Sequence, residues 1–131
     1  MVHLWKLYCR SILDQCCAVW GSSITKENQE DLERTQKSFC KLVLRERYRD
    51  YGTALVELDL ETLSSRRETL MTKFAKTSID NQKLHKLFPL RNTEHEMQLR
   101  DPPTYRTTKA NTERFYKSSI LHMQRTLNEE D

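Results

Sequence analysis

The stretch TKENQEDLERTQKSFCKLVL, residues 25–44, decides the fold class, because its apolar and polar positions separate on a helix. Its apolar residues recur at spacings of three and four, which places them on one face of an α-helix. Thr25 predicts the start, since its hydroxyl can accept from an unpaired backbone N–H. The other face is acidic first and basic last, the order that the helix dipole favours. The expected inner face consists of Leu32, Gln36, Phe39, Cys40, Val43 and Leu44.

Two further long helices are expected on either side of this stretch. The first spans residues 4–20 and is ended by Gly21, and the third begins near Thr62 and continues to residue 79. No segment shows the alternation of apolar and polar residues that is typical of a strand, so the predicted class is all-α. The residues expected to point inward are Trp5, Tyr8, Cys9, Ile12, Cys16, Val19 and Trp20 in the first helix, and Leu63, Leu70, Phe74, Ala75 and Ile79 in the third.

The predicted organisation is a small helical bundle followed by an extended, partly helical basic tail. A short helix or turn over residues 51–58, capped by Asp59, completes the bundle within residues 1–80. Beyond residue 80, prolines interrupt the pattern and apolar residues become sparse, so residues 81–131 are expected to be a partly disordered linker ending in an amphipathic helix. That last helix is expected from Thr112, with an apolar stripe of Tyr116, Ile120, Met123 and Leu127.

Composition excludes several classes of protein. The chain of 131 residues has a net charge of +3, and no apolar run approaches the roughly 20 residues of a membrane span. The N-terminal segment carries charges where a signal peptide is apolar, which favours an intracellular location, cytoplasmic or nuclear. With two glycines in the whole chain there is no phosphate-cradling loop, and we expect no small-molecule substrate.

The cysteines and histidines do not form a pattern that predicts a metal site or a catalytic site. Zinc sites need close ligand pairs such as C-x-x-C, and none of the four cysteines has that spacing. Cysteines on apolar helix faces behave as small hydrophobes, and in a reducing compartment they remain thiols. The chain also lacks a nucleophile-elbow pattern. We therefore expect no catalytic residue, no metal and no cofactor.

Basic and aromatic residues are interleaved around the end of the central helix. Phosphate contacts combined with base stacking use this combination in single-stranded nucleic acid binding. The opposing interpretation is a solvated charged face, which is common on helices, and a net charge of +3 does not decide between the two. The residues concerned are Lys37, Lys41, Arg45, Arg47 and Arg49, with Tyr48 and Tyr51 among them.

Four segments, in order and spacing, carry a resemblance to a known family. Residues 7–20, LYCRSILDQCCAVW, are similar to a helix of the form R-S-I/V-L-E-Y/Q-x-x-x-V-W that follows the palm of reverse transcriptases from non-LTR, LINE-type retrotransposons. Residues 31–37, DLERTQK, are similar to the family's L-E-R-V-Q-K/R. Residues 58–68, LDLETLSSRRE, are similar to L-x-L-x-S/T-L-x-x-R-R, and residues 111–128 resemble the tail of many such elements.

The resemblance implies the thumb-and-linker region of such a polymerase. The family's palm carries paired aspartates that bind the catalytic metal ions, and this chain has no Asp-Asp pair, so it is not expected to be an enzyme by itself. Its implied partners are RNA or an RNA/DNA duplex and an upstream palm domain. The matched basic positions predicted to contact phosphates are Lys37, Lys41, Arg66 and Arg67.

Three alternatives stay open at this point. Arg66 and Arg67 can instead pair with Glu61 or Glu68 on their own helix, which leaves them a structural role. The apolar stripe of the last helix can dock into a groove of another protein, which makes the chain a helical interaction module. The chain can also be a truncated gene product without independent function, whose exposed apolar face promotes aggregation.

Overall fold

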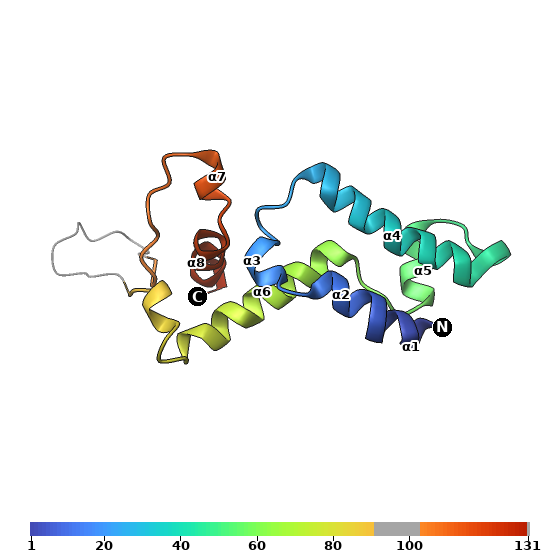
Figure 1. Ribbon diagram of the computed structural model, residues 1–131, viewed down its shortest axis with the longest axis horizontal. Coiled ribbons are helices and arrows are strands. Elements are labelled where there is room, and N and C mark those ends of the chain that lie inside the picture. The colour runs from blue at the N-terminus through green and yellow to red at the C-terminus, as the bar shows by residue number, and fades with distance from the viewer. Residues whose placement is uncertain (91–102, 131) are drawn as a thin grey trace. The chain divides into compact units, whose positions relative to one another are not determined.

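The structure, a computed structural model, describes residues 1–90 and 103–130 (Figure 1). These residues form helices and no strand, which confirms the all-α class, and Leu90 and Tyr105 share one isolated antiparallel bridge. None of the described helices is both long enough and apolar enough to cross a membrane. The helices are α1 (Val2–Leu4), α2 (Arg10–Asp14), α3 (Cys17–Trp20), α4 (Lys26–Leu44), α5 (Tyr51–Glu57), α6 (Leu63–Ile79), α7 (Glu113–Tyr116) and α8 (Ser119–Glu130).

The chain divides into two compact units, and each unit is made of two separate stretches of the sequence. The first unit comprises Met1–Cys17 and Ile24–Thr69. The second comprises Ala18–Ser23 and the chain from Leu70 onward. Helix α6 therefore contributes its first seven residues to one unit and the rest to the other, whereas the boundary predicted from the sequence lies after residue 80.

The N-terminal helix predicted over residues 4–20 is wrong as an unbroken element. A wider π-helical turn occupies Trp5–Cys9, and the helix stops after Asp14, where Gln15 leaves the helical region and Cys16 adopts a φ of 54°. Both changes rotate the side chains that follow, so a face projected at 3.6 residues per turn is lost. Trp5 is buried as predicted, whereas three of the expected inward residues are 65–72% exposed: Tyr8, Ile12 and Val19.

Helix α4 confirms its prediction at both the start and the inner face. The hydroxyl of Thr25 accepts a hydrogen bond from the backbone N–H of Asn28, 3.3 Å away. Gln36, Cys40 and Leu44 are buried, and the other three predicted inner residues are half-buried. The cap and the apolar period agree here, which is why this helix could be placed from the sequence alone.

Helix α6 begins where expected and buries part of the predicted stripe: Leu63 and Ala75 are buried, and Leu70 and Ile79 are half-buried. The hydroxyl of Thr62 accepts from the N–H of Ser65 at 3.1 Å, which caps the start. Phe74, expected inside, is 41% exposed, because the buried side is rotated toward a row that includes an arginine. The buried row consists of Leu63, Arg67, Met71, Ala75 and Ser78.

Each unit has its own apolar core. In the first unit, Trp5 stacks on Phe39 with ring centroids 4.4 Å apart, and both pack into a cluster from α4, α5 and the loop after α5. That cluster consists of Cys40, Leu44, Ala54, Leu55 and Leu60. In the second unit, the buried cluster consists of Ala75, Phe88, Met123 and Leu127.

The C-terminal helix predicted from Thr112 is present in two pieces. Thr112 caps α7 by accepting from the N–H of Phe115, and a turn separates α7 from α8. The predicted apolar stripe divides: Met123 and Leu127 are 3% and 5% exposed, whereas Tyr116 and Ile120 are 53% and 40% exposed. Met123 and Leu127 are thus covered by the second unit's own core, and these two residues are not available to the groove of a partner.

Candidate nucleic-acid interface

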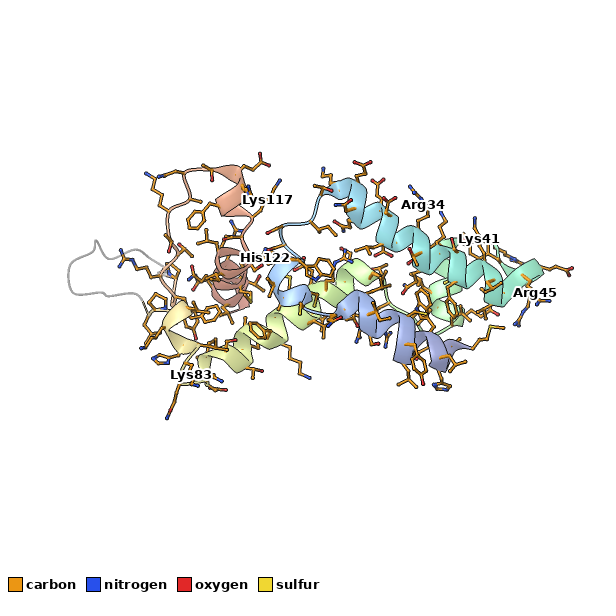
Figure 2. The ribbon with its side chains drawn as sticks, in the orientation of Figure 1. Arg34, Lys41, Arg45, Lys83, Lys117 and His122 are labelled. Carbon is orange, nitrogen blue, oxygen red and sulfur yellow. The ribbon has the colours of Figure 1, made fainter. Side chains whose placement is uncertain are left out.

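A row of four cations lies along α4 and the turn that ends it. Arg34, Lys37 and Lys41 follow one another at spacings of three and four, which places them on one face of the helix, and Arg45 follows at its C-terminal cap with a φ of 49°. All four are exposed. Figure 2 shows Arg34 and Lys41 along α4 and Arg45 at its end. We call these four residues the basic stripe.

Most of the basic stripe is not neutralised by carboxylates. Arg34 donates to Asp31 at 2.6 Å within the same helix. In the part of the chain that the structure describes, Lys37, Lys41 and Arg45 form no ion pair, and the ammonium of Lys41 lies 5.6 Å from the ring centroid of Tyr48. Residues 34–49 contain six Lys or Arg and one Glu, so the local charge is strongly positive. Such a row can bind phosphates.

A groove runs beside the N-terminal half of α4, and it has a mixed charge. Its lining includes the carboxylates of Glu30 and Glu33 as well as three cations, one of which is Lys37. Opposite charges within one groove cancel much of the field that an anion would meet. Arg34 and Lys37 belong both to this groove and to the basic stripe, whereas Lys41 and Arg45 lie outside the groove, so the candidate anion-binding surface is the stripe and is least opposed by carboxylates at its Lys41–Arg45 end. The groove residues are Lys26, Gln29, Glu30, Glu33, Arg34, Lys37 and Tyr51.

Arg66, one of the four predicted phosphate contacts, is held by two carboxylates. Its Nε lies 2.6 Å from Asp14 Oδ2, and its Nη1 lies 3.0 Å from Glu61 Oε1. Burial lowers the pKa of Arg66, but the hydrogen bonds to Asp14 and Glu61 outweigh this effect and raise the pKa above its ordinary value. The contact with Glu61 is the pairing considered from the sequence, and the contact with Asp14 fastens α2 to α6.

Arg67, the neighbouring predicted contact, is 4% exposed. It occupies the buried row of α6 between Leu63 and Met71. A phosphate in solution cannot reach a side chain in that position while the helix stays packed, so the position of Arg67 does not fit the predicted phosphate contact. Lys37 and Lys41 are the two predicted residues that the fold leaves accessible to a phosphate.

A polar network beneath the basic stripe fixes α4 against α5 and α6. The hydroxyl of Tyr51 donates to Glu33 Oε2 at 2.6 Å, and Glu33 Oε1 accepts from the N–H of Ser64 at 2.8 Å. Gln36 Nε2 donates to the Tyr51 hydroxyl at 3.1 Å and to the carbonyl of Glu61 at 2.7 Å. Burial, and then the bond to Glu33, raise the pKa of Tyr51 well above its ordinary value.

The hydrogen bonds of Tyr51, Glu33 and Gln36 were not predicted from the sequence, although the position of Gln36 gave one indication of them. Gln36 falls on the predicted inner face of α4, and a buried amide in an apolar row needs hydrogen-bond partners. The polar contacts of the first unit join residues far apart in the sequence, which is why they could not be predicted. Glu33 is 31 residues from Ser64, and Asp14 is 52 residues from Arg66. Three of the segments quoted for the resemblance therefore supply polar residues that meet within the first unit.

The described residues contain no cluster of side chains suited to hold a metal ion. Within residues 1–90 and 103–130, no three side chains among His, Cys, Asp and Glu come together as metal ligands. The cysteines are free thiols, with Cys9 and Cys16 exposed and Cys17 and Cys40 buried. Burial raises the pKa of the Cys40 thiol, which disfavours the nucleophilic thiolate.

Comparisons of the chain with protein-family models, with curated proteins and with solved structures gave no match.

Proposed function

We propose that this chain is the thumb-and-linker part of a non-LTR, LINE-type reverse transcriptase, and that its first unit holds the sugar-phosphate backbone of RNA or of an RNA/DNA duplex. The basic stripe is the contact surface. In this proposal the chain has no catalytic activity of its own, and polymerisation belongs to a separate palm domain that supplies the metal-binding aspartates.

One observation carries the proposal: the basic stripe has cations that no carboxylate neutralises, on a helix that hydrogen bonds of Glu33 and Gln36 connect to the neighbouring elements. From residue 34 to residue 45 the stripe extends about 16 Å, at about 1.5 Å per residue. That length covers about five base steps of a strand that rises about 3.4 Å per step. Phosphate contacts of this kind orient a duplex without selecting a sequence.

The family part of the proposal is supported by the positions of the matched residues. Glu33 and Arg66 come from two of the four segments that resemble the family and match its pattern, and Asp14, from a third, stands where the family pattern has Glu. Each of the three forms a hydrogen bond that joins one segment of the first unit to another. Residues with such structural roles are restricted in what can replace them. Two residues that match the family pattern, Glu33 and Arg66, therefore hold structural positions in the first unit.

The test is titration of a fluorescent RNA/DNA hybrid with the full chain, followed by anisotropy. The double variant Lys37→Gln/Lys41→Gln removes two exposed cations of the stripe. Each lost phosphate contact lowers the magnitude of the slope of log K against log salt by about 0.7–0.9, so the variant is expected to lower it by about 1.4–1.8. Binding is expected to be equal for hybrids of different sequence.

The matched control is Lys26→Gln/Lys73→Gln, which removes the same charge from exposed positions off the stripe. It is expected to keep the salt slope of the unmodified chain. Equal slopes for both double variants would place the contact elsewhere and reject the stripe. Unchanged anisotropy at low salt would reject nucleic-acid binding altogether.

A further inference from the structure

The groove beside α4 contains one carboxylate whose oxygens are engaged and one whose oxygens are not. Glu33 Oε2 accepts from the hydroxyl of Tyr51, and Glu33 Oε1 accepts from the N–H of Ser64. Glu30 lines the same groove and is exposed. Among the residues that the structure describes, its side chain has no hydrogen bond and no ion pair. The carboxylate of Glu30 is therefore free to accept a hydrogen bond from a ligand.

Glu30 lies beside two cations of the basic stripe. Arg34 and Lys37 line the same groove, and Arg34, whose Nη1 donates to Asp31, keeps further N–H groups for a phosphate. Glu30 and Arg34 are four residues apart on α4, which is about one turn or about 6 Å along the axis, so they are neighbours on the helix surface. Each sugar of a nucleic acid is bonded to the adjoining phosphates. A phosphate held at Arg34 therefore brings a sugar within reach of Glu30.

An ionised carboxylate in this position distinguishes the two kinds of sugar. It has no proton to donate, so it can only accept a hydrogen bond. The ribose of RNA has a 2′-hydroxyl that donates one, whereas the deoxyribose of DNA has no donor at that carbon. A carboxylate also repels the phosphates of either strand, and this repulsion lowers affinity. With RNA, a charge-assisted hydrogen bond from the hydroxyl offsets the repulsion, and with DNA nothing does.

We propose that Glu30 accepts a hydrogen bond from a 2′-hydroxyl and thereby makes the basic stripe select an RNA strand over a DNA strand. This selection rests on the proposed function, since Glu30 meets a sugar only if the stripe holds a sugar-phosphate backbone. Lys41 and Arg45, which lie outside the groove, hold phosphates of either kind of strand. In an RNA/DNA hybrid, the RNA strand is therefore the one that lies along α4.

Two hybrids that differ only at the 2′ carbon test this selection. In one, a DNA strand is paired with RNA, and in the other with 2′-fluoro RNA of the same sequence, which keeps the sugar conformation of RNA but has no 2′ donor. Fluorescence anisotropy with the full chain is expected to show about three- to tenfold tighter binding of the hydroxyl hybrid, the contribution of one hydrogen bond. Glu30→Ala is expected to bind the two hybrids equally.

Glu27→Ala is the matched control, because it removes the same charge from an exposed position of α4 that does not line the groove. It is expected to keep the preference for the hydroxyl hybrid. Equal binding of both hybrids by the unmodified chain would overturn the selection of RNA, as would a preference that persists in Glu30→Ala or disappears equally in both variants. Each of these results leaves phosphate binding by the basic stripe intact, whereas a chain that binds neither hybrid at low salt overturns the proposed function as well.

Discussion

Arg66 and Arg67 are neighbours in sequence and have different structural roles. The arginine at position 66 extends to two carboxylates at the edge of the first unit, whereas the one at position 67 lies in the buried row of α6. Successive residues on a helix point about 100° apart, so one residue of shift separates a part-buried ion pair from a packed position. The paired charge on Arg66 belongs to the architecture of the unit rather than to a ligand.

Tyr51 makes the stability of the first unit sensitive to alkaline pH. The folded state raises its pKa, so above the ordinary value of 10.0 the unfolded chain releases a proton that the folded chain keeps. Stability is therefore fully present below pH 10 and falls as the pH rises beyond it. Tyr51→Phe is expected to cost about 1 kcal/mol at neutral pH, through the lost hydrogen bonds. Urea unfolding is also expected to show a shallower alkaline decline for the variant.

Tyr116→Phe provides the matched control for this experiment. Tyr116 is 53% exposed in the second unit, and its ring keeps its contact with the guanidinium of Arg125 after the hydroxyl is removed. Its stability at neutral pH and its alkaline decline are expected to follow those of the unmodified chain. A Tyr51→Phe variant with the same alkaline decline as this control would show that Tyr51 titrates as an ordinary tyrosine.

Part of the candidate site could be predicted from the sequence, for a physical reason. Lys37 and Lys41 lie opposite the apolar period of α4 and follow its acidic first turns, so their exposure could be inferred. The burial of Arg67 could not, although its spacing of four from Leu63 and from Met71 places it on their face. A charge is ordinarily assigned to solvent, and only the packed structure reveals that its neighbours cover it.

At the scale of the helices, the end of α5 has a well-defined motif with an unusual residue in it. The N–H of Leu60 donates to the carbonyl of Leu55 at 2.8 Å, and the N–H of Asp59 donates to the carbonyl of Val56 at 3.2 Å. This is the pair of bonds of a Schellman motif, which needs a left-handed residue at the position of Asp59. Asp59 has a φ of 50°, where glycine is favoured.

Asp59→Gly is therefore expected to stabilise the chain by about 0.5–1 kcal/mol, because glycine adopts the left-handed region without a Cβ clash. The ion pair with Lys6 is lost, but the Asp59 side chain is 99% exposed in it and such pairs contribute little. Thermal unfolding is expected to shift upward by a few degrees.

Asp59→Asn separates the backbone effect from the charge. Asparagine tolerates the left-handed region about as well as aspartate but carries no charge, so its unfolding temperature is expected to match that of the unmodified chain. An Asp59→Gly variant that unfolds at a lower temperature than Asp59→Asn would mean that the left-handed conformation stores no strain at this position.

The helices differ in how well the sequence predicted them, and the difference lies in local geometry. Helix α4 has a cap, an apolar period and a suitable charge order that all agree. The segment before it has the period but not the regular pitch, because of the π-helical turn at Trp5–Cys9 and the left-handed Cys16. Periodicity assumes a constant rotation per residue, so it cannot register a change of pitch within the segment.

At the scale of the whole molecule, the two units have separate cores, and each is expected to have its own stability. Met123 is 3% exposed in the second core, so Met123→Ala is expected to cost that unit about 2–4 kcal/mol. By hydrogen exchange, amide protection is expected to fall in α8 and in the second half of α6, and to remain in α4.

Ile120→Ala is the control on the same helix, since Ile120 is 40% exposed and its truncation opens no cavity. It is expected to leave protection in α8 close to that of the unmodified chain. If Met123→Ala lowered the protection of α4 as much as that of α8, the chain would be a single cooperative unit instead of two.

Residues 18–23 belong to the second unit although they lie between the two stretches of the first, and this has a consequence for synthesis on the ribosome. The partners within the first unit are all complete once residue 69 has been made. The segment Ala18–Ser23 instead finds its partner in Ser119, whose hydroxyl bonds to the carbonyl of Val19 across 100 residues. This short segment of the nascent chain therefore lacks its final contacts until Ser119, at the start of the last helix, has been translated.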